Sequence, residues 1–184
     1  MELYKRIIEI VDANLIYCLI PIILTLILVK LIFKSRFETK KALNLVRWFI
    51  IFYTIALIIY FLIGIILFPE KFAFIDRATG PYKVAYWIML FSSTVFPFSL
   101  FIKKLSKSFL YVLLVAFCMK IGMFFERYVI IVTSLHRDYP TIDNNSTWSS
   151  PLIYGVAIIF LQGFIIGILM LGIFEIVKRK KSDA

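Results

Sequence analysis

The stretch GMFFERYVIIVTSLHRDYP, residues 122–140, combines an apolar run with charges that a membrane interior tolerates poorly. Glu126 and Arg127 lie inside the run, and the polar residues His136 and Asp138 stand at its end. Placing one Arg, Lys or Asp at the centre of a membrane helix costs roughly 2.5–3.5 kcal/mol. A charge pair kept in so apolar a run therefore predicts a role in packing or in function.

The rest of the chain is equally apolar. Hydrophobic residues make up 62% of the 184 residues, and the mean hydropathy is +0.94. A soluble domain contains about 45–50% apolar residues. Long apolar runs with few charges predict an all-α polytopic membrane protein. The alternating strands of about ten residues that are typical of an outer-membrane barrel do not occur in the sequence.

Charge and ligand-type residues exclude several functions. The net charge of +10 would favour nucleic acid binding in a soluble protein. Here the basic residues cluster between apolar runs, where they set membrane topology, so we expect a lipid bilayer and no nucleic acid as partner. The chain has one histidine and two cysteines. This chain alone therefore cannot build a bis-histidine haem, an ordinary zinc site or an iron–sulfur site, and we expect no metal or cofactor bound by it alone.

We expect three regions along the chain. Residues 1–14 form an amphipathic interfacial segment, residues 15–177 a five-helix transmembrane domain, and residues 178–184 a basic tail. The five spans are expected at about residues 15–33, 45–68, 84–102, 109–135 and 152–177. Basic residues concentrate in the loop 34–47, in the loop 103–107 and in the tail. The positive-inside rule then predicts an outside N-terminus and a cytoplasmic C-terminus.

Local signals modify this pattern of spans. Pro21 is expected to kink the first span. The polar run Ser92 to Thr94, followed by Pro97, predicts a broken or kinked third span, in which polar side chains satisfy the freed carbonyls. Gly163 and Gly167 have GxxxG spacing, which indicates either a helix-contact face or a chance occurrence.

The charges of the fourth span allow two interpretations. At 1.5 Å per residue, Lys120 lies about 16 Å along the helix from Phe109, and Glu126 about 25 Å, so Lys120 is near mid-membrane. One interpretation is a polar or proton-conducting track that ends at His136 and Asp138. The other is a buried ion pair that fixes helix packing, followed by an ordinary solvated helix end.

Residues 122–139 resemble the late-helix signature of the NrfD/polysulfide reductase membrane-anchor family, in the form found in the ActC subunit of alternative complex III. The stretches FAFIDRATGPY (72–82) and AYWIM (85–89) are similar to a loop and the helix that follows it in the same family. The resemblance covers nearly the whole chain but only about the C-terminal half of the family. It implies a four-helix bundle plus one peripheral helix, and a split gene, a reduced genome or a truncated paralogue as the origin of the chain.

The resemblance also implies a function. Members of the family take electrons from a quinol and pass them to a peripheral iron–sulfur subunit, without a redox metal of their own. We therefore expect a subunit of a quinol-oxidising respiratory complex in the bacterial inner membrane, with quinol as the substrate of the complex. The expected partners are an iron–sulfur subunit, cytochrome c-type subunits and another NrfD-like membrane chain, such as a separate N-terminal half.

Site residues follow from the same comparison. Glu126 and Arg127 match the buried pair of the family, and His136, Arg137 and Asp138 match the outer end of that helix. Glu126 would relay a proton with Arg127 tuning its affinity, and His136 and Asp138 would take part in proton exit or border the quinol site. The first bundle, which brings further quinol ligands, has no counterpart here. A purely structural anchor for a redox module and a degenerate remnant without quinol chemistry are the alternatives.

Overall fold

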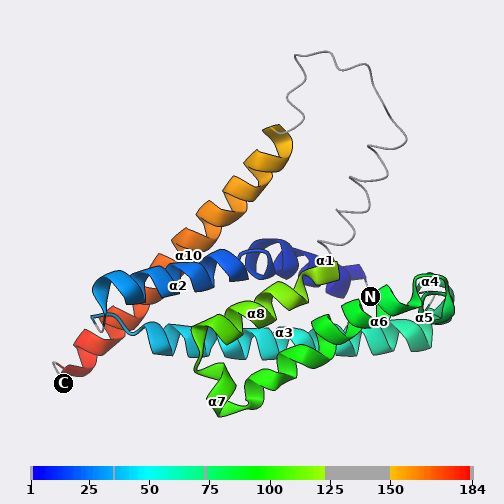
Figure 1. The fold of residues 1–184 in the computed structure, drawn as a ribbon, viewed down its shortest axis with the longest axis horizontal. Helices are drawn as coiled ribbons and strands as arrows, with labels where there is room; N and C mark the ends of the chain where they lie inside the picture. Colours follow the sequence, from blue (N-terminus) through cyan, green and yellow to red (C-terminus); the bar gives the residue numbers. More distant parts are fainter. Residues whose placement is uncertain (1, 35, 73, 123–149, 183–184) are drawn as a thin grey trace.

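The computed structural model describes residues 2–34, 36–72, 74–122 and 150–182, and most of these residues are helical, with no strand among them. Figure 1 shows long helices side by side, with α10 crossing them at an angle. The long elements are α1 (Glu2–Val11), α2 (Leu19–Phe33), α3 (Thr39–Leu67), α6 (Lys83–Leu90), α8 (Phe109–Met119) and α10 (Ser150–Ser182). The short helices are α4 (Pro69–Phe72), α5 (Phe74–Thr79) and α7 (Lys103–Ser106).

Four helical segments are long and apolar enough to cross a membrane: Arg6–Phe33, Thr39–Leu67, Lys83–Phe101 and Gly155–Lys180. They coincide with the first, second, third and fifth predicted spans, which confirms the helical membrane class. The predicted fourth span begins with α8 and continues beyond the described residues. The fourth span, and with it the total of five, the membrane orientation and the boundaries of the three regions stay predictions.

The core lies where α2, α3, α8 and α10 meet. Long apolar side chains from all four helices are buried there: Leu19, Ile23, Leu26, Ile50, Ile51, Val112, Val115 and Leu171. The outer faces of the same helices expose large apolar side chains such as Phe52, Leu110 and Leu169. Exposed apolar surface on every long helix is what contact with lipid requires, because the bilayer replaces water as the solvent.

The GxxxG pair lies at the contact between α10 and α2. A Cβ atom on Gly163 would lie 2.5 Å from Cγ of Pro21, and one on Gly167 would lie 3.1 Å from Cβ of Thr25. The two glycines therefore let the helix backbones approach closely, as small residues do in membrane helix pairs. The interpretation of this spacing as a helix-contact face is confirmed.

The predicted break in the third span is also confirmed. Helix α6 passes into a π-helical turn (Phe91–Val95) and then into a 3₁₀ helix (Phe96–Phe101). The Ser93 hydroxyl donates to the carbonyl of Met89 at 2.9 Å, and the Thr94 hydroxyl donates to the carbonyl of Leu90. Side-chain donors thus bond carbonyls at the place where the regular ladder changes, as a membrane interior demands.

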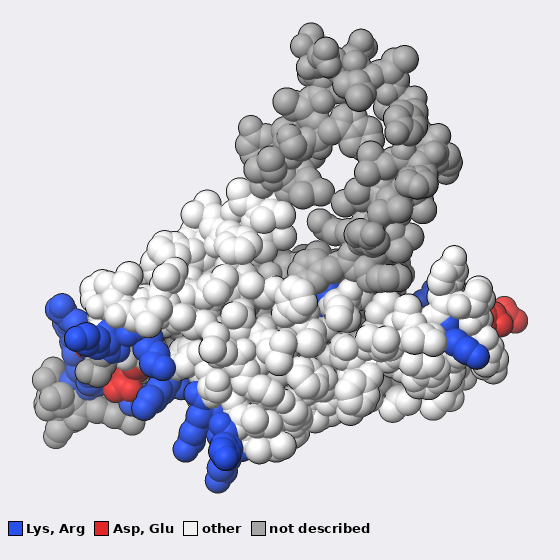
Figure 2. Space-filling view, in the orientation of Figure 1, with Lys and Arg blue, Asp and Glu red and all other residues white. Residues whose placement is uncertain are grey.

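Basic side chains gather at one end of the bundle (Figure 2). Cavities at that end are lined by lysines from α2, α3, α7 and the loop 34–38, and one also by Phe174 of α10. The basic loops that the sequence places on one side of a membrane are therefore close together in space.

Candidate functional site

An ion pair joins the N-terminal helical segment to the end of α8. The Nζ atom of Lys120 lies 2.6 Å from Oδ1 of Asp12. The hydroxyl of Tyr53 donates to the same carboxylate oxygen at 3.2 Å. The ring centroid of Tyr17 lies 3.9 Å from the Lys120 ammonium, in cation–π contact. Lys120 is only 7% exposed, so water contributes little to stabilising its charge and the contacts with Asp12 and Tyr17 must do so.

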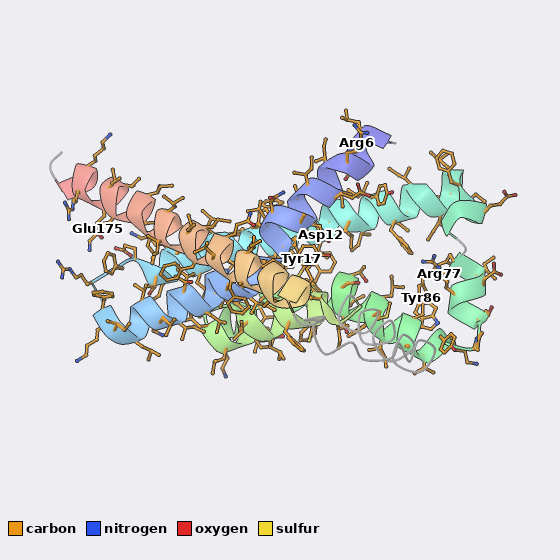
Figure 3. All side chains as sticks on the ribbon, turned by 90° about the horizontal axis from the view of Figure 1, so that it is seen from above. Arg6, Asp12, Tyr17, Arg77, Tyr86 and Glu175 are labelled. Carbon is orange, nitrogen blue, oxygen red and sulfur yellow. The ribbon has the colours of Figure 1, made fainter. Side chains whose placement is uncertain are left out.

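A π-helical turn, Asp12–Ile16, places the carboxylate. Pro21 has no N–H to donate, and its ring clashes with the carbonyl four residues earlier, that of Tyr17. The helix is accordingly irregular up to Cys18 and becomes regular from Leu19. The kink expected at Pro21 thus appears as a helical interruption just before it. Figure 3 shows Asp12 and Tyr17 at this junction of α1 and α2.

The end of α8 places the ammonium. Lys120 follows the last regular residue of this helix, and its backbone N–H still donates to the carbonyl of Phe117 at 3.0 Å. The preceding residues Val112, Val115 and Ala116 are fully buried against the core. Packing along one face of α8 therefore directs the lysine at its end inward, toward Asp12.

The cluster lies at mid-depth of the bundle. Tyr53 is the central residue of α3, which runs from Thr39 to Leu67. At 1.5 Å per residue, its Cα atom is about 21 Å along the axis from either end of this helix. Because α3 is long and apolar enough to cross a membrane, the cluster lies midway along a candidate span, where an uncompensated charge would be costly.

Further polar side chains connect the turn with α10. Gln162 donates to the backbone carbonyl and to Oδ1 of Asn14, both at 3.3 Å. Asn14 in turn donates to the carbonyl of Ile10 at 2.8 Å. Polar groups of the π-helical turn thus contact three other helices, through Tyr53, Lys120 and Gln162.

This arrangement can do two things. It can hold or pass a proton, because the Lys120 ammonium and the Tyr53 hydroxyl both donate to the same carboxylate oxygen of Asp12. It can also fix helix packing, because a buried ion pair loses its compensation when either partner moves away. The described residues contain no group of three or more His, Cys, Asp or Glu side chains that could hold a metal ion.

The site predicted from the sequence lies elsewhere. Glu126, Arg127, His136, Arg137 and Asp138 all fall in 123–149, outside the described residues. Their proposed roles stay predictions.

Sequence reasoning placed Lys120 near mid-membrane without a role, and the structure supplies its partners. Residues 1–14 were predicted as an interfacial segment, so the pairing of Asp12 with Lys120 was not predicted. The available signal was electrostatic. A lysine in an apolar run needs an acid, and Asp12 immediately precedes the first apolar run.

Comparison with known proteins yields no relative. No protein-family model, no curated protein and no solved structure matches the chain. The site's own geometry is therefore the basis for its chemistry.

Proposed function

We propose that the chain is an integral membrane subunit of a quinol-oxidising respiratory complex, in which Asp12, Lys120 and Tyr53 relay protons through the middle of the membrane. One observation carries the relay: three protonatable side chains meet within hydrogen-bond distance at mid-depth of the bundle. The quinol rests on the likeness of residues 72–89 and 122–139 to the NrfD/polysulfide reductase anchor family.

The geometry favours transfer between Lys120 and Asp12. A proton that moves from Nζ to Oδ1 crosses a 2.6 Å hydrogen bond and converts an ion pair into a neutral pair. The net charge of the site does not change, so this step avoids the large cost of creating a new charge in a medium of low dielectric constant. Tyr53 stabilises the ionised carboxylate through its hydroxyl and offers a second route to and from the same oxygen.

The proposed membrane location rests on the distribution of basic residues, and the proposed partners rest on the likeness to the NrfD/polysulfide reductase family. Because basic residues gather at one end of the bundle, we place that end, with the C-terminus, at the cytoplasmic face of a bacterial inner membrane. The proposed partners are an iron–sulfur subunit, cytochrome c-type subunits and a second NrfD-like chain. Glu126, His136 and Asp138 would continue the proton path toward the outer face.

The experiment is proton release by the purified complex in proteoliposomes, with quinol as reductant. Asp12→Asn should reduce coupled proton release at least tenfold while the complex still assembles, because the amide cannot take up the proton. Glu70→Gln is the matched control, since it neutralises an exposed acid in α4 that is far along the chain from the cluster. Unchanged proton release in Asp12→Asn would exclude the relay.

A second candidate function is a purely structural anchor for a redox module. The contact of Lys120 with the Tyr17 ring favours it, since stacking fixes the side chain in a single place. This role predicts that Asp12→Asn lowers the yield of the assembled complex, while the complex that does form oxidises quinol and releases protons at the wild-type rate.

Purification in mild detergent with mass spectrometry tests the assembly itself. Co-purification with iron–sulfur, c-type haem and NrfD-like membrane chains is the expected result. A solitary chain would remove the basis for quinol chemistry and would favour a degenerate remnant or an independent function.

A further inference from the structure

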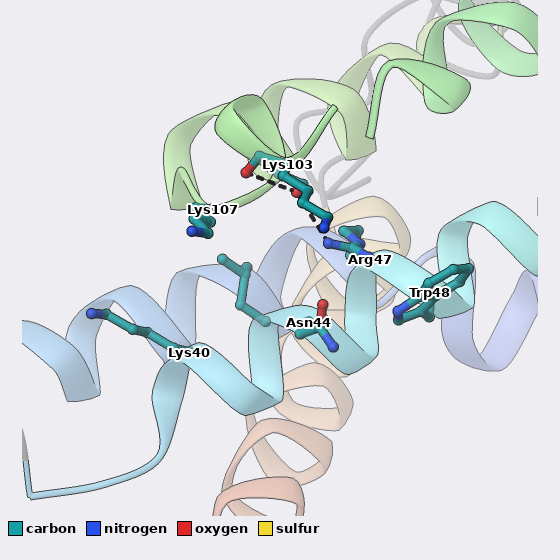
Figure 4. Close-up of a pocket in the computed structure, with 8 residues that line it drawn as sticks. Lys40, Asn44, Arg47, Trp48, Lys103 and Lys107 are labelled. Carbon is teal, nitrogen blue, oxygen red and sulfur yellow. Dashed lines mark hydrogen bonds between the residues drawn. The ribbon is translucent and has the colours of Figure 1, made fainter. Parts of the chain in front are cut away.

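A cavity of about 680 Å³ lies between the first half of α3 and α7, at the basic end of the bundle (Figure 4). Four of its lining residues are basic, and none of the described lining residues is acidic. The cavity is lined by Lys40, Leu43, Asn44, Arg47, Trp48, Lys103, Ser106 and Lys107. It shares no residue with the Asp12 cluster and does not depend on quinol chemistry.

Arg47 is held in place from two sides. Its Nη1 atom donates to the hydroxyl of Ser106 at 3.1 Å, and its guanidinium carbon lies 5.0 Å from the centroid of the Trp48 ring. Ser106 is 3% exposed, and its own hydroxyl donates to the carbonyl of Lys103 at 3.4 Å. The guanidinium group is therefore oriented before any ligand arrives.

One donor of this guanidinium group has no acceptor. The Nε atom of Arg47 is buried and lacks a hydrogen-bond partner within the described part of the chain. Because this atom is buried, a ligand in the cavity reaches the Arg47 guanidinium group through its other N–H groups or after a small rotation of the side chain. The planar donor fork of arginine matches the oxygen atoms of phosphate and carboxylate groups.

Among the residues that the structure describes, the other positive charges of the cavity have no acidic partner. In the described ranges, acids near this end are paired with cations outside the cavity: Glu38 with Lys41 at 3.4 Å, and Glu175 with Arg179 at 3.7 Å. No ion pair between described residues involves a basic side chain of the cavity. Several close cations without an acidic partner create a positive potential that favours binding of an anion.

An aromatic surface adjoins the cavity. Trp48 stacks on Phe52, with ring centroids 5.6 Å apart, and meets the ring of Phe101 edge-on at 6.2 Å. Phe52 and Phe101 are 63% and 51% exposed, so both present apolar surface toward the lipid. A ligand with a phosphate head and an apolar tail would contact both the basic cavity and the aromatic surface. Free phosphate would contact only the cavity.

We propose that this cavity binds the phosphate of an anionic phospholipid whose acyl chains lie on the Trp48–Phe52–Phe101 surface. Arg47 lies about 12 Å along α3 from Thr39 and about 9 Å from the level of Tyr53, and its long side chain can extend toward the lipid head groups. Basic pockets between helices at the cytoplasmic face are known to hold such head groups. Tryptophan is likewise concentrated at this depth of a bilayer.

The test uses the full chain in phosphatidylcholine nanodiscs that contain increasing fractions of phosphatidylglycerol. Native mass spectrometry then counts the phosphatidylglycerol molecules that remain bound. Lys40→Gln/Lys107→Gln should weaken retention about tenfold or more, because both cations line the cavity. The matched control, Lys178→Gln/Lys180→Gln, removes the same charge from the exposed end of α10 and should retain the lipid as the wild type does.

A second variant separates geometry from charge. Arg47→Lys keeps the positive charge but lacks the donor fork, so it should weaken retention of phosphatidylglycerol. Its thermal unfolding temperature in detergent should stay close to that of the wild type, which shows that the chain is folded. Equal retention by the two double variants would overturn the proposal. So would tight binding of inorganic phosphate in pure phosphatidylcholine nanodiscs, because the ligand would then be the free ion.

Discussion

Lys120 and Asp12 form a 2.6 Å ion pair across 108 residues of sequence, with the ammonium group also stacked on Tyr17. The lysine side chain is 8% exposed and that of the aspartate 31%. The pair therefore ties the first helical segment to the end of α8 at a depth where neither charge has a substitute partner in lipid. Its removal has consequences that can be measured separately from any transport function.

Lys120→Met should destabilise the protein by about 3 kcal/mol, because it leaves the Asp12 carboxylate without its counter-charge. This value is at the lower end of the range for buried pairs, because the Asp12 side chain is 31% exposed. The measurement is chemical or thermal unfolding in detergent. Lys83→Met at an exposed position of α6 is the control and should change stability by no more than about 0.5 kcal/mol.

A double-mutant cycle distinguishes the pair from its surroundings. Asp12→Asn combined with Lys120→Met removes both charges, so the double variant should be more stable than the sum of the two single effects predicts. A coupling free energy of about 1–3 kcal/mol is expected for groups in direct contact. Strict additivity would show that the two side chains do not interact in the folded protein.

Tyr53→Phe should cost about 1.5 kcal/mol of stability, because it removes one hydroxyl that donates to a charged acceptor while the ring keeps its packing. Tyr4→Phe provides the comparison, since the Tyr4 hydroxyl donates to the carbonyl of Ala56 at an exposed site. The control should change stability by a smaller amount. Equal effects in the two variants would contradict a special role of the bond to Asp12.

The sequence was sufficient to predict the four spanning segments, because each is a long apolar run bounded by charged or turn residues. It was also sufficient for the break after Leu90, since Pro97 cannot donate a backbone hydrogen bond and nearby hydroxyl groups can. Gly163 and Gly167 indicated a contact face because lack of a side chain is useful only where another backbone comes close. These features depend on residues that are neighbours in the sequence.

The pairing of Asp12 with Lys120 could not be predicted in the same way. A regular helix places Asp12 on the polar face of an amphipathic segment, opposite Ile7 and Val11. The π-helical turn that begins at Asp12 adds a residue to the turn and so changes the direction of the side chains around it by up to about 100°. Local periodicity contains no information about a partner that lies 108 residues away.

Thr94→Val should destabilise the third span by about 0.6 kcal/mol, the average for a side-chain hydrogen bond inside a membrane protein. The threonine hydroxyl donates to the carbonyl of Leu90 at the π-helical turn, and valine has nearly the same shape without a donor. Thr79→Val is the control, because its hydroxyl bonds the carbonyl of Ile75 in the same way at an exposed site. Unfolding in detergent should show a smaller change for Thr79→Val, and a larger one would contradict the role of Thr94.

Gly163→Ala should be the most informative change at the contact of α10 with α2. The new Cβ atom would lie 2.5 Å from Cγ of Pro21 and 3.0 Å from the carbonyl oxygen of Cys18, and neither a proline ring nor a backbone carbonyl can move away cheaply. The helices must separate slightly, at a cost of roughly 1–3 kcal/mol. Gly172→Ala on the same helix meets nothing within 4 Å and should instead raise stability by up to about 1 kcal/mol through helix propensity. Because the two substitutions add the same methyl group to the same helix, opposite shifts in the unfolding midpoint would locate the contact, and equal shifts would contradict it.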